Sequence, residues 1–94
     1  MKTFLKLYIA GQTIKSHAAV KNLHRVVKLA KEEVELDIID VLDSPGLAER
    51  DHITATPVVI REVPKPIRRI VGDLSSLDLV MRELDITKGE RPNE

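Results

Sequence analysis

The fold of this chain is set largely by one stretch, Thr56–Ser75, which reads Thr-Pro-Val-Val-Ile-Arg-Glu-Val-Pro-Lys-Pro-Ile-Arg-Arg-Ile-Val-Gly-Asp-Leu-Ser. A β-branched run at 58–63 is interrupted by prolines within 64–66, resumes at 67–71 and stops at Gly72-Asp73. Such a pattern predicts two short strands joined by a proline-stiffened turn, followed by the start of a helix. The stretch is therefore expected to form a β-hairpin that leads into a C-terminal helix.

The positions of the prolines in this stretch indicate where strands begin and where the chain turns. Pro57 has no N–H to donate, so it belongs at the mouth of the first hairpin strand. Bonds that precede proline can be cis and isomerise slowly, which makes Pro57, Pro64 and Pro66 candidates for slow conformational change.

The first half of the chain has the pattern of a strand, a helix and a strand. Residues 3–10 alternate, with one clearly apolar side, and residues 17–31 place apolar side chains on one helical face, with Ser16 as the expected cap. Residues 34–41 alternate again and become more apolar toward their end. This order predicts a βαβ unit with two parallel strands.

Between this unit and the hairpin, Ser44 and Pro45 predict the start of a short helix through residue 50. Asp40 lies among apolar residues at a strand end, where we expect its carboxylate to accept backbone hydrogen bonds. A C-terminal helix is expected with Asp73 or Ser75 as its cap and an inward face formed by Leu74, Leu77, Val80, Met81 and Leu84.

The length of 94 residues is enough for one domain with a modest core. We expect the C-terminal helix to end at residues 87–89, a single domain over residues 1–88 and a disordered tail over 89–94, which is almost free of apolar side chains. No apolar run approaches a membrane span and no signal-peptide pattern is present, so we expect a cytoplasmic protein without membrane contact.

Composition excludes several kinds of chemistry. The chain has no cysteine, so disulfides, thiolate catalysis and CxxC redox chemistry are excluded. His17, His24 and His52 have no metal-binding spacing, and we expect no catalytic, cofactor-binding or metal-binding residues.

Charge is unevenly distributed although the net charge is zero. Residues 1–31 contain seven basic and no acidic side chains, whereas residues 32–56 contain eight acidic side chains and one basic one. This division favours steering of a charged partner or association with a second copy, as a dimer or tetramer, unless the two segments simply neutralise each other within one fold. Zero net charge and only two aromatic residues argue against nucleic-acid binding.

The element order, with a proline that opens the third strand, resembles the thioredoxin fold. Within it, the segments 5–13, 39–42, 47–49, 55–57 and above all Arg68-Arg69-Ile70-Val71-Gly72-Asp73-Leu74-Ser75 are similar to the KaiB family of circadian clock proteins. The resemblance covers nearly the whole chain.

The resemblance implies an α/β, non-enzymatic protein that binds the ATPase KaiC and modulates its phosphorylation cycle. It also implies two arrangements of the C-terminal half, a tetrameric ground state (βαββααβ) and a thioredoxin-like form (βαβαββα) that engages KaiC. Residues 80–86 have apolar side chains at both alternate and helical spacings, which is compatible with either arrangement.

The resemblance further implies partner-binding roles for Lys6, His52, Arg61, Arg68 and Arg69, and fold-switch or turn roles for Pro57, Pro64, Pro66 and Asp73. Ala18, Asp37 and His52 replace basic residues that relatives carry. These differences leave open a KaiB-like stress-response adaptor that does not bind KaiC tightly.

An enzyme of thioredoxin type would place its site at residues 11–16, opposite Thr56-Pro57. That segment has serine and threonine but no thiol, and no base is evident beside it. We therefore expect no redox or transferase activity.

Overall fold

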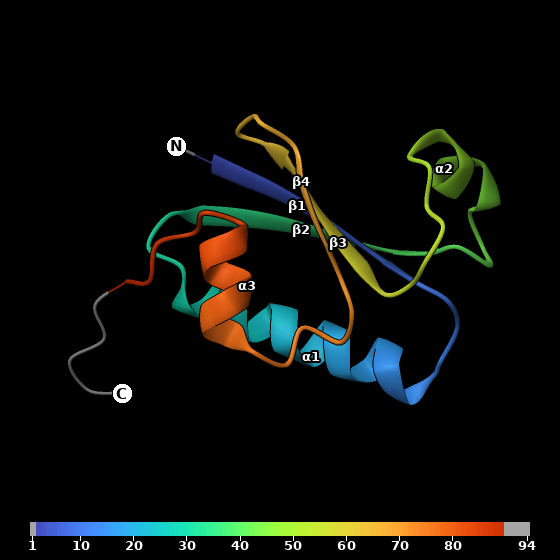
Figure 1. The fold of residues 1–94 in the computed structure, drawn as a ribbon, viewed down its shortest axis with the longest axis horizontal. Helices are drawn as coiled ribbons and strands as arrows, with labels where there is room; N and C mark the ends of the chain where they lie inside the picture. The colour runs from blue at the N-terminus through green and yellow to red at the C-terminus, as the bar shows by residue number, and fades with distance from the viewer. Residues whose placement is uncertain (1, 90–94) are drawn as a thin grey trace.

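The computed structural model describes residues 2–89 and contains seven helices and strands. In chain order these are β1 (Lys2–Ile9), α1 (Ile14–Leu29), β2 (Glu33–Asp40), α2 (Pro45–Arg50), β3 (Val58–Val63), β4 (Arg68–Val71) and α3 (Leu77–Glu83). This order is βαβαββα (Figure 1). Of the two arrangements that the family resemblance implies, the chain therefore adopts the thioredoxin-like one.

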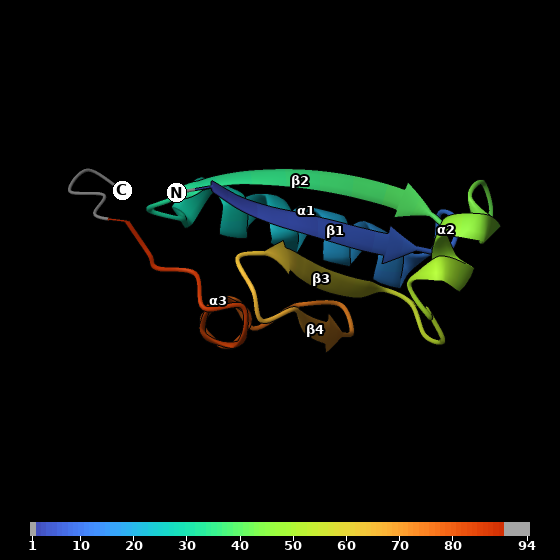
Figure 2. The same cartoon turned by 90° about the horizontal axis from the view of Figure 1, so that it is seen from above.

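The four strands form one mixed sheet in the order β2-β1-β3-β4, which Figure 2 shows across its width. β1 and β2 are parallel over eight residue pairs, from Lys2 opposite Glu33 to Ile9 opposite Asp40, as the βαβ pattern predicted. β3 is antiparallel to both of its neighbours, and its pairing with β4 confirms the predicted hairpin.

The larger core lies on the sheet face covered by α1 and α3. Leu5 and Leu7 of β1 meet Leu23 of α1 and Leu84 beside α3, all of them almost completely buried. All five residues predicted for the inward face of the C-terminal helix contact this core, but Leu74 does so from the loop before α3, so its place on the helix was predicted wrongly.

A second, smaller core lies on the opposite face beneath α2. Tyr8, Val58 and Ile60 are buried there, against Leu47 and Ala48 of α2. The sequence predicted only one apolar side for β1, which was wrong at Tyr8 because α2 and the following loop cover that end of the strand.

The first helix begins earlier than expected. Thr13, not Ser16, caps α1, and its Oγ1 accepts a hydrogen bond of 3.1 Å from the backbone N–H of Ser16. Ser16 is therefore three residues inside the helix and almost fully buried, because an N-cap side chain reaches the backbone N–H two or three residues ahead.

The last helix also begins elsewhere. Its N-cap is Ser76 rather than Asp73 or Ser75. The Asp73 carboxylate instead accepts a 3.1 Å hydrogen bond from Ser75 N–H, which forms a local turn. Leu74 adopts φ +62° and inserts its side chain into the larger core from this loop.

α3 ends at Glu83, earlier than the predicted stop at residues 87–89. Asp85 adopts φ +56°, and the N–H of Ile86 donates to the carbonyl of Met81 at 2.8 Å. Together with the bond from Asp85 N–H to Arg82, this forms a Schellman motif that directs Ile86 into the core.

The chain beyond α3 returns to the N-terminal half. Lys31 N–H donates to the carbonyl of Thr87 at 2.7 Å, and Gly89 N–H donates to the carbonyl of Leu29 at 2.8 Å. Gly89, which the sequence pattern places in the tail, is therefore part of the folded domain, while residues 90–94 lie outside the described residues.

Candidate functional site

Three of the expected partner-binding residues lie around the C-terminal end of α2. Across the sheet, Lys6 of β1 is paired with Ile60 of β3, which is paired with Arg69 of β4. Side chains in register share one face of a sheet, so Lys6 and Arg69 both point toward the side covered by α2. His52 follows α2 directly and is exposed.

Lys6 is the cation of a compact ionic cluster. Its Nζ lies 2.9 Å from Glu62 Oε2 and 3.4 Å from Asp51 Oδ2. The hydroxyl of Tyr8 donates to the same Asp51 oxygen, and it lies 3.4 Å from the carbonyl of Leu47. These contacts fix the end of α2 to the centre of the sheet.

The cluster changes the titration of its members. Burial, followed by the hydrogen bond to Asp51, raises the pKa of Tyr8 to about 12. The bond that Tyr8 donates lowers the pKa of Asp51, against the opposing effect of burial. The hydrogen bond to Glu62 raises the pKa of Lys6. All three groups therefore keep their ordinary neutral-pH forms.

Arg69 contacts the main chain at the end of α2. Its guanidinium donates to the carbonyl oxygens of Asp51 and His52, the latter at 3.4 Å. A cation at this position complements the partial negative charge of a helix C-terminus. His52 itself adopts φ +56° and is the left-handed residue of a Schellman motif, with Ile53 N–H donating to Ala48 at 2.9 Å.

Arg68 and Arg61 are not part of this group. Arg68 is paired with Arg61, which is paired with Leu5, so both arginines point to the face covered by α1 and α3. Arg68 is exposed there, whereas Arg61 is only 2% exposed. Arg61 therefore offers no surface for a partner in this arrangement.

The four expected turn residues lie at element boundaries. Pro57 is buried immediately before β3, Pro64 and Pro66 lie in the β3–β4 turn, and Asp73 follows β4. The peptide bonds that precede the three prolines are cis.

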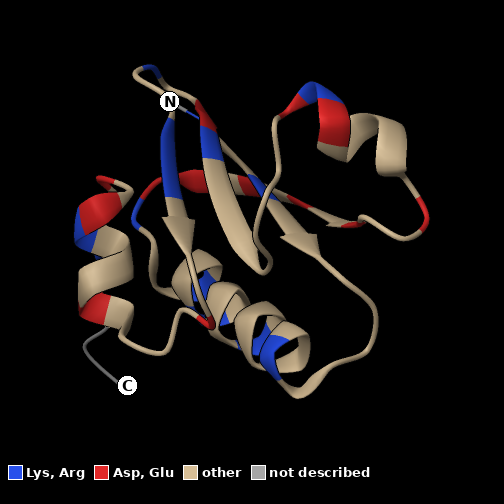
Figure 3. Ribbon diagram, turned by 45° about the vertical axis from the view of Figure 1, so that its right-hand side comes forward, with Lys and Arg blue, Asp and Glu red and all other residues tan. Residues whose placement is uncertain are grey.

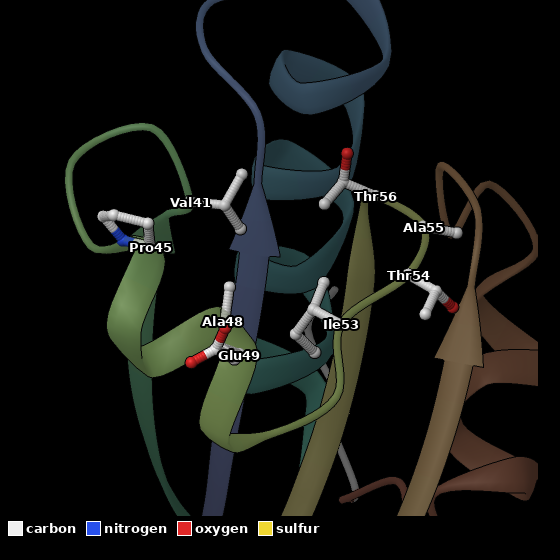
Figure 4. Close-up of a pocket in the computed structure, with 8 residues that line it drawn as sticks. All are labelled: Val41, Pro45, Ala48, Glu49, Ile53, Thr54, Ala55 and Thr56. Carbon is white, nitrogen blue, oxygen red and sulfur yellow. The ribbon is translucent and has the colours of Figure 1, made fainter.

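A shallow groove of about 550 Å³ lies beside α2. It is lined by Val41, Pro45, Ala48, Glu49, Ile53, Thr54, Ala55 and Thr56. Figure 4 shows the side chains of Val41, Ala48 and Ile53 pointing toward one another between α2 and the loop that leads into β3. These three residues also pack against the smaller core, so the groove is its exposed continuation.

The family model described as the KaiB domain matches residues 6–86, which is almost the whole chain. The chain belongs to the KaiB family.

Curated relatives agree with this assignment. The circadian clock oscillator protein KaiB of Synechococcus elongatus is 46% identical over 95% of this chain and 89% of that protein. The circadian clock protein KaiB3 of Synechocystis is 39% identical over 87% of this chain and 81% of that protein.

Solved structures of other proteins match the thioredoxin-like fold of this KaiB-family chain. The N-terminal domain of Synechococcus elongatus SasA matches with a TM-score of 0.66 and 23% identity, over 97% of this chain and 90% of that one. Mitochondrial thioredoxin 3 of Saccharomyces cerevisiae matches with a TM-score of 0.73 and 17% identity, over 88% of this chain and 76% of that one.

The KaiB-family chain lacks the thiols on which thioredoxin redox chemistry depends, because its sequence contains no cysteine. The segment after β1 instead turns at Gly11, whose φ is +70° and whose N–H donates to Asp40 Oδ1 at 3.1 Å. The same oxygen accepts from Leu42 N–H at 2.9 Å, which confirms the predicted backbone hydrogen bonds to Asp40.

Residues 2–89 contain neither a metal-binding cluster of side chains nor a membrane-spanning helix. No group of three or more acidic or histidine side chains there is placed to hold a metal ion. No helix in this part of the chain is both long and apolar enough to cross a membrane.

The sequence did not identify Tyr8, Asp51 or Glu62 as parts of the site. The alternation of β1 already places Tyr8 on the same side as Lys6, which is the one local signal for Tyr8. Nothing local indicates Asp51 or Glu62, because their contacts with Lys6 depend on how α2 and β3 pack against β1.

Proposed function

We propose that this KaiB-family protein is a non-enzymatic regulator that binds a KaiC-type ATPase and modulates its phosphorylation and ATPase cycle. The observation that carries this proposal is the match of residues 6–86 to the KaiB domain, together with 46% identity to a circadian clock oscillator protein. A protein that regulates by binding needs an accessible surface rather than a catalytic site.

The proposed binding surface is the α2 face, defined by Lys6, His52 and Arg69. His52 and Arg69 are exposed, and Lys6 is partly so. The side chains of Lys6 and Arg69 are held in place, Lys6 by Glu62 and Asp51 and Arg69 by the carbonyl groups at the end of α2. Pre-positioned charges favour association, because less conformational entropy is lost on binding.

The test is binding to KaiC of Synechococcus elongatus in the presence of nucleotide. His52→Glu replaces an exposed side chain at a left-handed position, and we expect it to weaken binding about five-fold, the effect of one exposed ion pair. Arg69→Glu should weaken binding further, with circular dichroism used to check that α2 persists. Arg68→Glu, on the opposite face, is the matched comparison.

The outcomes separate the possibilities. If only Arg68→Glu weakens KaiC binding, the binding surface lies on the face covered by α1 and α3. Unchanged binding by all three variants would remove these residues from the interface. No binding by the unaltered protein would contradict the proposed KaiC partner.

We extend the proposal to self-association and to a second arrangement of the C-terminal half. The basic residues of α1 and the acidic residues of β2 are segregated, as the blue and red segments in Figure 3 show. Sedimentation at tens of micromolar, a range typical of weak assemblies, should reveal dimers or tetramers. Monomers alone would contradict this part of the proposal.

The alternative is a stress-response adaptor with a KaiB-like domain. Asp37 favours it, because this exposed carboxylate is paired in register with Lys6 and adds negative charge beside the proposed surface. Asp37→Lys should strengthen KaiC binding if the charge is inhibitory. An unchanged absence of binding would favour the adaptor.

A further inference from the structure

The groove beside α2 has an apolar floor that no other part of the described chain fills. Val41, Ala48 and Ile53 are only half-buried, although they extend the smaller core. Figure 4 shows their side chains converging from three directions. The volume of about 550 Å³ is ample for a branched aliphatic side chain from another molecule.

One wall of the groove is a stretch of main chain with open hydrogen-bonding groups. Ile53 N–H donates to Ala48 and Pro57 C=O accepts from Gly72, both at 2.9 Å. Between them, the N–H and C=O groups of residues 54–56 have no hydrogen-bond partner among the described residues. Thr54 and Ala55 are also exposed. Residues 55 and 56 bend and form no strand edge, but their open peptide groups can hydrogen-bond individually to the main chain of a bound peptide.

The one charged side chain among the described residues that line the groove is acidic. This residue is Glu49, and Asp43 lies in the loop that precedes α2. Both are exposed, and neither forms an ion pair among the described residues. Within residues 2–89, no lysine or arginine lines the groove. The negative charge of Glu49 therefore favours a cationic ligand.

We propose that this groove binds an extended polypeptide segment with an aliphatic residue and, two positions away, a lysine or arginine. The segment's main chain pairs with residues 54–56, its aliphatic side chain enters between Ala48 and Ile53, and its cation meets Glu49. The two-residue spacing follows because alternate side chains of an extended chain lie on the same side. The groove adjoins the α2 face, so this inference rests on the proposed function and specifies one part of the partner.

The test uses two synthetic probes and the full chain. The basic probe is acetyl-Gly-Val-Ser-Lys-Gly-amide, and the acidic probe replaces its lysine with glutamate. In a nuclear magnetic resonance titration we expect the basic probe to shift the amide signals of residues 53–56 with a Kd on the order of 1 mM. The acidic probe should bind at least about three-fold more weakly, as expected for one exposed ion pair.

Charge variants test the assignment of the cation. Glu49→Gln should weaken binding of the basic probe about two- to five-fold, and Glu49→Lys should reverse the preference toward the acidic probe. Glu83→Gln is the matched control, because Glu83 is exposed on α3 at the opposite face of the sheet. A reversed preference is independent of small changes in stability.

Three outcomes would overturn the inference. The first is that the amide signals of residues 53–56 do not shift, and the second is that both probes bind equally well. The third is that these signals shift with protein concentration in the absence of probe, because a second copy of the protein would then occupy the groove. Failure of probe binding with intact KaiC binding would refute the groove alone. Probe binding without KaiC binding would instead refute the proposed partner.

Discussion

The N-terminal and C-terminal halves of this sheet are held together in different ways. In the first half, β1 and β2 pair over eight residues, and the 16-residue α1 covers them with a continuous apolar face. In the second half, β4 has four residues and α3 has seven. Elements this short gain little stability from their own hydrogen bonds.

Side chains that bond to distant main-chain groups compensate in the C-terminal half. Arg61 donates from Nη1 to the carbonyl of Leu84 at 2.7 Å and from Nη2 to the carbonyl of Pro66 at 2.8 Å. One buried guanidinium thus connects β3, the β3–β4 turn and the end of α3. Apolar periodicity therefore specifies the first half, whereas a few long-range polar contacts specify the second.

Arg61→Met should cause the largest loss of stability among single substitutions at these polar contacts. It removes both bonds and leaves two carbonyl groups without their donor, so we expect a loss of about 3 kcal/mol in the free energy of unfolding. Urea denaturation measures that loss. Native-state hydrogen exchange should accelerate in α3 and the β3–β4 turn before it does in β1 and α1.

Arg82→Met is the matched control, because Arg82 is exposed on α3. We expect it to change stability by less than about 0.5 kcal/mol. Equal acceleration of exchange in both halves of the Arg61→Met protein would contradict the proposed difference between them.

This difference explains which parts of the fold were predictable. The βαβ unit, the hairpin and the short helix follow from periodicity, proline positions and the Ser44-Pro45 pair. The limits of α3 were not predicted, because they depend on positive φ values at Leu74 and Asp85 that the sequence pattern did not indicate. The sequence also did not predict the burial of Arg61, because this burial depends on a contact with Leu84, 23 residues further along the chain.

The candidate site was predicted only in part. The family resemblance supplied Lys6, His52 and Arg69, and the structure places all three near one end of α2. The groove could not be predicted, because it exists only where α2 and residues 53–56 approach each other.

Tyr8→Phe tests a polar contact that ties the first half to α2. It removes the hydrogen bond to the Asp51 carboxylate, and we expect a loss of about 2 kcal/mol at neutral pH. Exchange should accelerate in α2 rather than in α3. An unchanged unfolding midpoint would show that this buried hydroxyl contributes nothing to stability.

The same contact predicts the pH dependence of stability. Because the pKa of Tyr8 rises from its ordinary 10.0 to about 12 on folding, its contribution is present below pH 10 and is lost as the pH rises toward 12. The lowered pKa of Asp51 gives a contribution that is present at neutral pH and is lost as the pH falls below its ordinary 3.8.

Tyr8 can be titrated directly, since it is the only tyrosine and the chain has no tryptophan. Ultraviolet absorbance of tyrosinate should give a pKa near 12 in the folded protein, and Asp51→Asn should lower it by removing the negative charge. A pKa near 10 before unfolding would contradict both the burial of the Tyr8 hydroxyl and its hydrogen bond to Asp51.

Asn22→Ala should have a smaller effect, because it removes one neutral bond between the halves. Asn22 Nδ2 of α1 donates to the carbonyl of Asp73 at 2.8 Å and anchors the loop that precedes α3. We expect a loss of about 1 kcal/mol in denaturation experiments. The exposed neighbour Lys21 is the control, and an equal loss in Lys21→Ala would assign the effect to α1 itself.

The smallest effects should come from the two Schellman motifs, where the halves differ once more. His52 and Asp85 both adopt φ +56°, a conformation that costs glycine less than other residues. Among residues 2–89, the His52 side chain forms no hydrogen bond or ion pair that would offset this cost, so His52→Gly should raise the free energy of unfolding by about 0.5 kcal/mol.

Asp85 differs, because its Oδ2 lies 4.0 Å from Arg61 Nη1. Asp85→Gly therefore removes a stabilising charge at the same time as it lowers the conformational cost of the positive φ. We therefore expect almost no net change at Asp85, and a gain there equal to that at His52 would show that the carboxylate contributes nothing to holding Arg61.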